Sequence, residues 1–540
     1  MKIYIKLKFN ILMYFILTFL LLNIITSCKH NTAAGNMTII NISIDIDTKT
    51  IKQISPFIYG VNVSPERFKA TAYRSGGNRT TGYNWENNLS NAGEDWHHFN
   101  DEYLVPKGKD GSIPAITITD FIEKAKKNDA YAMITLPMAG YVANDNKREV
   151  KLEETAPSAR FAKIIDRKNA ALSLTPDLND GVVYSDEFIN FLTNRFGTAD
   201  KGGINGYSLD NEPALWAFTH PRIHPQKVTV KEILEKSISL SSVVKDIDPA
   251  ADVFGPALYG VGAYANFQDA PDWKDFSKDY VWFIDAYLDG MRKAEEKNGR
   301  RLLDVLDVHY YTEARCALNH RICDDRSNEE NCIHTRFQST RTLWDWLYRE
   351  NSWVQQSLNK FLPVLPRLNA SIEKYYPGTK LAITEYNFGY ENHISGGIAQ
   401  ADALGIFAAN GLYLATLWPI SDDLSYAFAG INLYINYDGK GARFGGMLVN
   451  SSTNNVEYSS VYASTAEDGT LHIILLNKSQ KNAESFTINI DSDISYKTFT
   501  SYGFDASGSV IKLIGTGKIR KDNTLVIDVP ALSAYHLVVK

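Results

Sequence analysis

The sequence contains little cysteine and no excess of positive charge. Four cysteines in 540 residues are too few for a small scaffold built on disulfides. The 56 basic residues are outnumbered by 62 acidic ones, which gives a formal net charge of −6 and no basic footprint for a nucleic-acid partner. No apolar run after residue 25 has the length of a membrane span. These absences lead us to expect a globular protein whose main body is soluble.

Aromatic residues, by contrast, are plentiful. They make up 12% of the chain, with 30 tyrosines and 9 tryptophans, and hydrophobic residues together make up 44%. This composition excludes a disordered or low-complexity protein, and it suffices for the cores of one large domain and one smaller domain. Flat aromatic rings also pack against the C–H faces of sugars, so the composition favours carbohydrate binding as one possible function.

The N-terminus has the pattern of a targeting segment. Basic residues precede an apolar run over residues 9–25, which is typical of a signal peptide. Cys28 directly follows a Thr-Ser pair, and this sequence resembles a bacterial lipobox. The resemblance implies that residues 1–27 are removed, that Cys28 is acylated, and that residues 28–37 tether an exported lipoprotein to a membrane, which we expect to be the outer membrane. An uncleaved N-terminal anchor is the alternative.

The other three cysteines, Cys316, Cys323 and Cys332, lie in one polar stretch. In an oxidising compartment they can form one disulfide and leave one thiol. His320 and His334 lie among them, so a Cys/His metal site is the alternative, although the spacing matches no common zinc pattern. The sequence therefore favours a local disulfide in this stretch.

Residues 55–425 alternate short β-rich runs with longer amphipathic stretches, which include residues 185–196 and 230–245. Eight strands that alternate with helices indicate an α/β fold, a (β/α)8 barrel of the TIM type with extended loops. The expected strands are Phe57–Val61, Ala70–Arg74, Tyr131–Leu136, Gly206–Leu209, Asp252–Gly255, Val305–His309, Lys380–Thr384 and Leu412–Leu417.

Helical periodicity disappears after residue 425. Strand-like runs separated by turn signals fill residues 426–540, and this pattern predicts an antiparallel β-sandwich. Residues 38–54 precede the barrel and are also strand-like. We therefore expect this segment to join the same sandwich.

Two of the expected barrel strands end in a glutamate. Glu212 follows the fourth strand within Asp-Asn-Glu-Pro, and Glu385 follows the seventh within Thr-Glu-Tyr-Asn. Reactive groups in such barrels lie at the C-terminal ends of the strands, so the two carboxylates would face one cleft. Two carboxylates that flank one bond are what glycoside hydrolysis needs. Structural glutamates held in ion pairs are the alternative.

Three longer stretches carry specific motifs. They are residues 76–96, which begin with Gly-Gly-Asn-Arg-Thr-Thr, residues 209–225, which contain Asp-Asn-Glu-Pro, and residues 383–387, Ile-Thr-Glu-Tyr-Asn. On these motifs the chain resembles glycoside hydrolase family 44, the endo-β-1,4-glucanases and xyloglucanases, over roughly residues 38–540. The resemblance implies a retaining mechanism with Glu212 as acid/base and Glu385 as nucleophile. It also implies a β-glucan substrate (xyloglucan, carboxymethylcellulose or mixed-linkage glucan). The chemistry requires no metal or cofactor, although a structural metal ion is compatible with it.

Polar residues beside the two glutamates are candidate supports. Asn211 would hydrogen-bond a sugar 2-hydroxyl, and Asn78 would face the cleft from its glycine-rich turn. Arg74 would pair with the nucleophile or with another carboxylate. His309 and Tyr310 end the sixth strand, and Tyr310 would either hold the nucleophile by a hydrogen bond or belong to the core.

Aromatic residues at strand ends or in loops are candidate sugar contacts, and a core position is the alternative for each tryptophan. The candidates are Trp85, Trp344, Tyr386 and Trp418. Ser75 departs from the family pattern, which usually has Trp before Gly-Gly-Asn, and this difference leaves the preferred polysaccharide open. The alternative functions are a retaining xylanase or mannanase and a non-catalytic glycan-binding lipoprotein. We expect a monomer.

Overall fold

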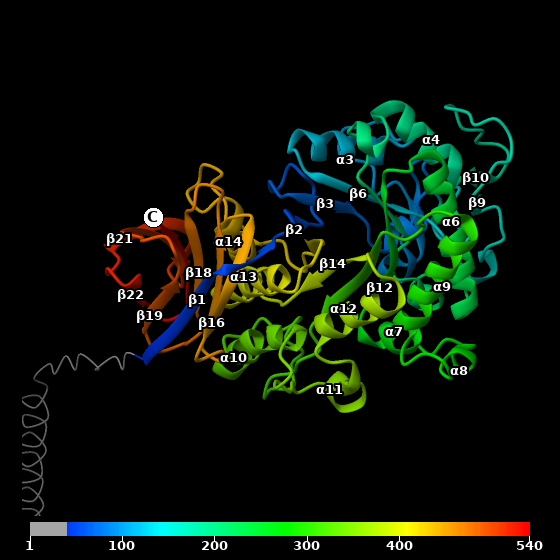
Figure 1. The fold of residues 1–540 in the computed structure, drawn as a ribbon. Helices are drawn as coiled ribbons and strands as arrows, with labels where there is room; N and C mark the ends of the chain where they lie inside the picture. Colours follow the sequence, from blue (N-terminus) through cyan, green and yellow to red (C-terminus); the bar gives the residue numbers. More distant parts are fainter. Residues whose placement is uncertain (1–39) are drawn as a thin grey trace, which may run out of the picture. The chain divides into compact units, whose positions relative to one another are not determined.

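A computed structural model describes residues 40–540, so the predicted signal peptide, Cys28 and the tether lie outside the described residues. Residues 41–540 form one compact unit. It contains a closed eight-stranded barrel and a nine-stranded sheet (Figure 1). Within this described part, no helix combines the length and the apolar character that crossing a membrane requires.

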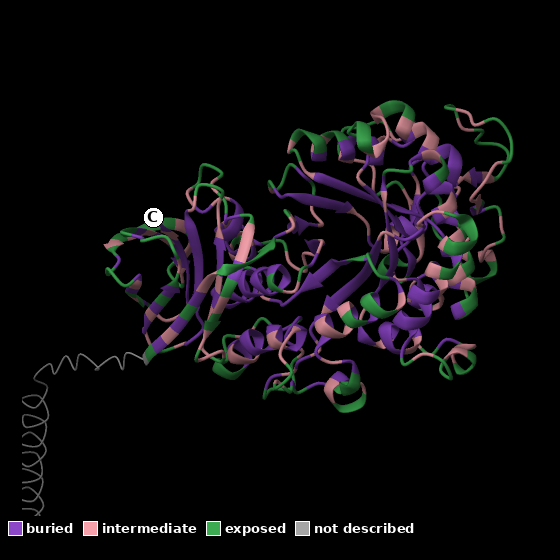
Figure 2. Cartoon of the chain, in the orientation of Figure 1, coloured by how far each residue is buried: buried purple, intermediate pink, exposed green. Residues whose placement is uncertain are grey.

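The barrel strands lie where the sequence predicts them. They are β2 (Phe57–Val61), β3 (Ala72–Ser75), β6 (Tyr131–Leu136), β11 (Gly206–Leu209), β12 (Asp252–Leu258), β13 (Val305–Tyr311), β14 (Lys380–Asn387) and β15 (Leu414–Leu417). They close in this order, and each pairs in parallel with its neighbours. The strands are buried almost throughout, because packed side chains fill the barrel and helices cover it (Figure 2). The predicted (β/α)8 barrel is confirmed.

Helices surround the barrel, and most of them are amphipathic. The longer ones are α3 (Ile116–Lys127), α4 (Ser185–Phe196), α6 (Val230–Ile247), α9 (Phe283–Asn298), α12 (Val364–Tyr375), α13 (Ile394–Ala409) and α14 (Ser425–Ile435). Helix α6 shows how the sequence sets such an element: the Thr229 hydroxyl caps its N-terminus by accepting from the N–H of Glu232. Its apolar residues, among them Ile233 and Leu240, face the core.

The loops that connect these elements contain small sheets and short helices. The strands are β4 (Ser90–Asn91), β5 (Phe99–Asp101) and β8 (Arg148–Glu149) in one sheet and β7 (Tyr141–Ala143), β9 (Phe161–Ile165) and β10 (Val182–Tyr184) in another. The α-helices are α2 (Asn78–Thr81), α5 (Trp216–Thr219), α7 (Val261–Asn266), α8 (Trp273–Phe276), α10 (Glu330–Ser339) and α11 (Trp353–Ser357). The 3-10 helices are η1 (Gly93–Trp96), η2 (Leu152–Glu154), η3 (Ala199–Lys201), η4 (Pro213–Leu215), η5 (Thr340–Leu343) and η6 (Asn359–Phe361).

The nine-stranded sheet joins both ends of the described chain. Its order is β21-β20-β23-β18-β17-β16-β1-β19-β22. Strand β1 pairs antiparallel with β16, and Figure 1 shows β1 in dark blue among the orange C-terminal strands. The strands are β1 (Ile40–Gln53), β16 (Met447–Thr453), β17 (Ser459–Thr465), β18 (Leu471–Asn477), β19 (Glu484–Asp491), β20 (Thr498–Asp505), β21 (Gly508–Lys518), β22 (Thr524–Val529) and β23 (Ser533–Val539). The expectation that the N-terminal segment joins this antiparallel domain is confirmed.

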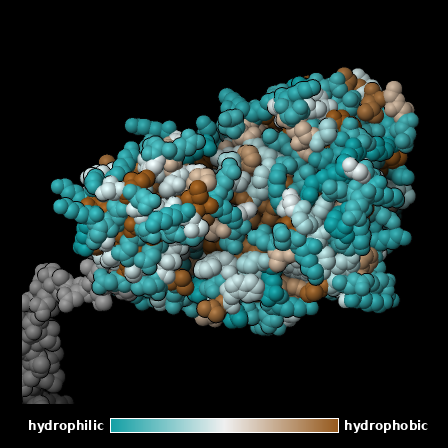
Figure 3. Space-filling model, viewed as in Figure 1, coloured by the Kyte–Doolittle hydropathy of each residue, from teal (hydrophilic) through white to brown (hydrophobic). Residues whose placement is uncertain are grey.

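All but the first residue of helix α14 lie within residues 426–540, which the sequence predicts to form the sheet domain. It follows β15 and packs mainly against α13, and it also contacts β2 of the barrel and β21 and β23 of the nine-stranded sheet, so it lies between the barrel and the sheet. The sequence pattern does not indicate this helix, because α14 is apolar on nearly every side and therefore shows no helical period. The face of the molecule seen in Figure 3 is mostly hydrophilic, with hydrophobic residues in scattered groups.

Candidate active site

Glu212 lies just beyond the C-terminal end of β11. The chain turns sharply there, since Asp210 and Glu212 have positive φ angles of 63° and 43°. The wholly buried Asp210 holds this turn: its carboxylate accepts from the Thr81 hydroxyl at 2.5 Å and from the N–H of Asn211 at 2.7 Å. A strained turn that is held in this way fixes the direction of the Glu212 side chain.

Glu385 lies in β14 between two donors. Arg74 Nη1, at the end of β3, donates to Glu385 Oε1 at 2.6 Å, and the Tyr311 hydroxyl donates to Oε2 at 2.8 Å. The Arg74 side chain is fully buried, so its charge is little screened by water. The predicted pairing of Arg74 with this glutamate is confirmed.

His309 lies between the two carboxylates. Its Nδ1 is 2.8 Å from Glu212 Oε1 and 3.5 Å from Glu385 Oε2. Burial lowers the pKa of His309 to about 3, so the ring is neutral near pH 7 and acts as a hydrogen-bonding group. One oxygen of Glu212 and one of Glu385 lie within 4.8 Å of each other. This closeness fits the separation of about 5–5.5 Å in retaining glycosidases better than the roughly 6.5–9.5 Å of inverting ones.

The environment of Glu212 suits a proton donor. Burial raises its pKa to about 7, because a buried carboxylate loses hydration; the Arg74 charge opposes this rise and the Asp95 charge adds to it. A general acid must be protonated at the pH where the enzyme works. Glu212 is therefore suited to donate a proton, whereas Glu385 is held by the donors Arg74 and Tyr311.

We expect kcat/KM to fall as pH rises through about 7, because the protonated fraction of Glu212 decreases above its pKa. Asp95→Asn removes a neighbouring negative charge and should move this alkaline limb to lower pH. A pH profile of both proteins on one soluble substrate tests this. A limb near the ordinary carboxyl value of 4.5 in the wild type would contradict the assignment.

Asn211 and Asn78 connect the site to its surroundings. Asn211 Oδ1 accepts from Arg74 Nη2 at 2.7 Å, and its Nδ2 donates to Asn78 Oδ1 at 3.2 Å. Asn78 Nδ2 donates to both oxygens of Asp95 at 3.0 Å. These predicted residues therefore form one polar network beside Glu212, which orients both amide groups.

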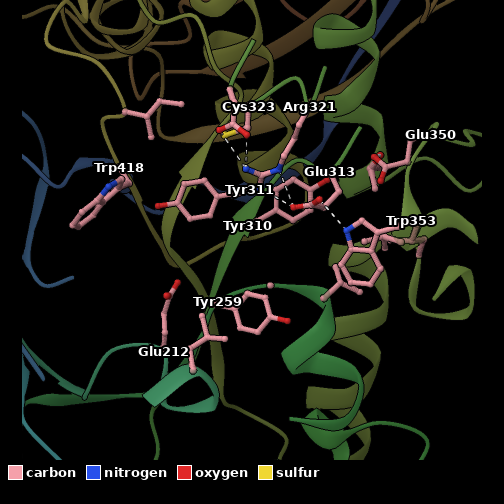
Figure 4. Close-up of a pocket in the computed structure, with 18 residues that line it drawn as sticks. Glu212, Tyr259, Tyr310, Tyr311, Glu313, Arg321, Cys323, Glu350, Trp353 and Trp418 are labelled. Atoms are coloured by element: carbon pink, nitrogen blue, oxygen red, sulfur yellow. Dashed lines mark hydrogen bonds and ion pairs between the residues drawn. The ribbon is translucent and has the colours of Figure 1, made fainter. Parts of the chain in front are cut away.

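A cavity of about 370 Å³ opens beside Glu212 (Figure 4). Aromatic residues form much of its wall, namely Tyr259, Tyr310, Tyr311, Trp353 and Trp418. Trp418 packs directly against Gly77, which has a φ of 92° and where a Cβ would come within 2.4 Å of the indole. Aromatic walls with a few polar groups are typical of a sugar-binding site. Trp418 is part of this wall, and its contact with a sugar stays a prediction.

Three predicted sugar contacts lie elsewhere. Trp85 is only 2% exposed and stacks on Phe188 in the core. Tyr386 is fully buried, and its hydroxyl accepts from Gln400 Nε2 at 2.7 Å. Trp344 is half-buried and lines a separate cavity beside α13 and β17. Trp85 and Tyr386 offer no ring face to the cavity at Glu212, and the predictions for these two residues are wrong. Trp344 does not line that cavity, and its contact with a sugar stays a prediction.

The predicted role of Tyr310 belongs to its neighbour. Tyr311 bonds Glu385, whereas the ring of Tyr310 packs against Phe388 and also lines the cavity. Successive residues of a strand point to opposite sides, so His309 and Tyr311 share the side that faces the carboxylates. This period of two was the signal that could have identified Tyr311.

Asp307 is a further residue of the site that the motifs in the sequence do not indicate. The same period of two places it on the side of β13 that carries His309 and Tyr311. It is fully buried, and its Oδ1 accepts from the Thr384 hydroxyl at 2.7 Å. Burial raises its pKa to about 7. Trp353 and Tyr259 were missed too, and nothing local in the sequence marks them.

The cysteine-rich stretch follows β13 on the side of the cavity. Cys316 and Cys332 form a disulfide, and Cys323 is a buried free thiol that lines the cavity. The expected outcome of one disulfide and one thiol is confirmed. Because both bonded sulfurs are occupied, the alternative of a Cys/His metal site does not apply to this pair.

The family model that matches is Glycoside hydrolase family 44, over residues 89–314. Among curated proteins, the chain is 49% identical over 497 residues to beta-mannanase/endoglucanase A of Caldicellulosiruptor saccharolyticus, an alignment that spans 88% of this chain and 37% of that protein. It is 47% identical over 517 residues to endoglucanase A of Paenibacillus lautus, across 94% of this chain and 74% of that protein. The chain thus spans little more than a third of the length of the first relative.

Solved structures give the same result. The chain is 52% identical to Cel44A, a family 44 endoglucanase from Clostridium thermocellum, with a TM-score of 0.90 over 93% of this chain and 100% of that chain. It is 47% identical to a family 44 xyloglucanase of Paenibacillus polymyxa solved with xyloglucan, with a TM-score of 0.90 over 93% of this chain and 99% of that one. With such identity over nearly the whole described part, the chain belongs to glycoside hydrolase family 44.

Proposed function

We propose that the chain is a retaining endo-acting glycosidase that cleaves β-1,4-glucan backbones, with xyloglucan among its substrates. The observation that carries this proposal is the pair Glu212 and Glu385, whose carboxylate oxygens approach within 4.8 Å at the ends of β11 and β14. The aromatic cavity beside them supports a sugar substrate. The names of the endoglucanase and xyloglucanase relatives support a β-glucan.

The reaction proceeds in two displacements. In the first, the Glu385 carboxylate attacks the anomeric carbon while Glu212 gives its proton to the leaving oxygen, and a glycosyl ester forms. In the second, Glu212 takes a proton from water as that water attacks the anomeric carbon and releases Glu385. Arg74 and Tyr311 keep Glu385 aimed throughout. Side chains supply both the nucleophile and the proton, so we propose that no cofactor takes part.

Hydrolysis of a polysaccharide panel tests this proposal. We expect turnover of xyloglucan, carboxymethylcellulose and lichenan, with initial products of retained β configuration by NMR. Xylan and mannan should react more slowly. Mannan as the fastest substrate would favour the second candidate, a mannanase, which the name of the Caldicellulosiruptor relative suggests. Binding of these polymers without any cleavage would reject an enzymatic function.

We also propose that the chain is exported and anchored by a lipid at Cys28. The Cys316–Cys332 disulfide supports an oxidising compartment. Cys28→Ala should therefore release the protein from the membrane fraction, because the acylated thiol is the proposed anchor. Fractionation with fatty-acid labelling measures this, and Lys29→Ala serves as the adjacent control that stays anchored. Unchanged, lipid-labelled protein in the membrane after Cys28→Ala would reject the lipobox.

A further inference from the structure

One exposed tryptophan in the cavity beside Glu212 has its ring nitrogen hydrogen-bonded to a neighbouring side chain. Trp353 begins α11, lines the cavity and is 42% exposed (Figure 4). Its Nε1–H donates to Glu313 Oε2 at 2.9 Å. Because the one polar atom of the indole is engaged in this bond, the exposed part of the ring is apolar and suits the C–H face of a sugar.

The other oxygen of Glu313 is held by an arginine. Arg321 Nε donates to Glu313 Oε1 at 2.9 Å, and Arg321 Nη2 lies 2.7 Å from the same oxygen in an ion pair. The Arg321 and Glu313 side chains are 25% and 24% exposed, so this pair is partly shielded from water. Figure 4 shows the resulting chain of contacts from Arg321 through Glu313 to Trp353. Among the described residues, none of the three is hydrogen-bonded to Glu212 or Glu385.

Arg321 stands in a loop that is closed covalently. The Cys316–Cys332 disulfide joins the two sides of this loop, and Cys332 belongs to α10. The N–H of Ile322 in this loop donates to the carbonyl of Ala314, just before the loop, at 2.9 Å, and Ala314, Cys316, Ile322 and Cys332 form a small hydrophobic cluster. The backbone on either side of Arg321 is therefore fixed by bonds that do not involve Trp353.

We propose that Glu313 and Arg321 are positioning residues for Trp353, and that the disulfide-closed loop thereby determines how tightly the cavity binds its β-glucan. The inference rests on the proposed function, since that function supplies the ligand. A held indole is preorganised for a glucose unit, whereas an indole without its Nε1 bond rotates and must be ordered when the sugar binds. The effect falls on binding and leaves bond cleavage to Glu212 and Glu385.

A double-mutant cycle between Glu313→Ala and Trp353→Phe tests this proposal. Phenylalanine keeps an aromatic face but has no N–H, so in the Trp353→Phe variant residue 353 cannot donate a hydrogen bond to Glu313. We expect each single variant to raise KM for a soluble xyloglucan oligosaccharide by about three- to tenfold, the scale of one aromatic contact, with kcat within about twofold. The double variant should match Trp353→Phe alone. Arg195→Ala, which breaks the exposed ion pair between Arg195 of α4 and Glu123 of α3, is the matched control and should leave KM unchanged.

The role of the disulfide-closed loop is tested in two backgrounds, the chain with Trp353 and the Trp353→Phe variant. Cys316→Ser with Cys332→Ser should raise KM when Trp353 is present and have no further effect in Trp353→Phe. Arg321→Lys, which keeps the charge but not the paired donors, gives a second variant should the serine pair fold poorly, and its KM should rise in the same way. Additive effects, unchanged KM, or losses confined to kcat would overturn the proposal.

Binding measurements separate this inference from the proposed function. The dissociation constant of the same oligosaccharide, measured by calorimetry in a Glu385→Ala background, should follow the KM changes. A wild-type protein that binds the oligosaccharide without cleaving it would reject the proposed function, and the dissociation constants would still decide whether Glu313 acts through Trp353. A protein that neither binds nor cleaves any β-glucan would overturn both.

Discussion

Glu385→Ala is expected to lower kcat by about 10⁴-fold or more, because no covalent intermediate can form without the nucleophile. Glu212→Ala should cost less, about 10²- to 10⁴-fold, the range of a lost general acid. The loss in Glu212→Ala should shrink further on substrates whose leaving group needs no proton. Steady-state kinetics on a polymer and on an aryl glycoside measure both effects. Thermal unfolding at the wild-type temperature would show that the barrel stays folded.

Azide separates the two roles by stereochemistry. In Glu212→Ala it should attack the glycosyl ester, restore part of the turnover and give a glycosyl azide of retained configuration. In Glu385→Ala it should attack the anomeric carbon directly and give the inverted product. Glu123→Ala, at an exposed position of the barrel surface, is the carboxylate control and should behave like the wild type. Near-normal turnover in either active-site variant, or the same product configuration in both, would contradict the assignment.

The barrel could be predicted because its strands are buried on both sides and are therefore short apolar runs between turn signals. For β6 and β11 the expected bounds, Tyr131–Leu136 and Gly206–Leu209, match the structure residue by residue. Helix α14 could not be predicted in this way. It lies between the barrel and the sheet domain, so its sequence is apolar on nearly every side and carries no period.

Some residues of the active site could be predicted from the sequence and others could not. Glu212 and Glu385 could be predicted because the end of a parallel strand is a place that chain topology fixes. The aromatic contacts could not, because the side to which a loop tryptophan turns depends on residues distant in sequence. Trp85 turns toward Phe188 of α4 and is buried, whereas Trp353 turns toward Glu313 and stays exposed. Neither partner is visible from the residues around each tryptophan.

Deletion of residues 447–540, which leaves α14 in place, is expected to make the barrel insoluble or to lower its unfolding temperature strongly. The residues removed include Ile474, Leu476 and Phe504, which share one hydrophobic core with the barrel helices. Asp402 of α13 would also lose its bond from the Tyr462 hydroxyl at 2.6 Å and its buried neighbour Lys478 at 3.8 Å. An apolar face and a carboxylate with fewer partners would both become accessible to water.

The same deletion would leave β1 without β16, and an unpaired strand of 14 residues is an edge that invites aggregation. A second truncation to residues 54–446 removes that edge but keeps the apolar face exposed, so it should aggregate less and yet remain destabilised. Expression, thermal unfolding and hydrolysis of a soluble oligosaccharide measure these outcomes. If either truncated chain were soluble, with full oligosaccharide turnover and weakened binding to polymer alone, the sheet would be an autonomous sugar-binding module. Because the sheet shares one hydrophobic core with the barrel helices, we expect instead that the sheet stabilises the barrel that carries the active site.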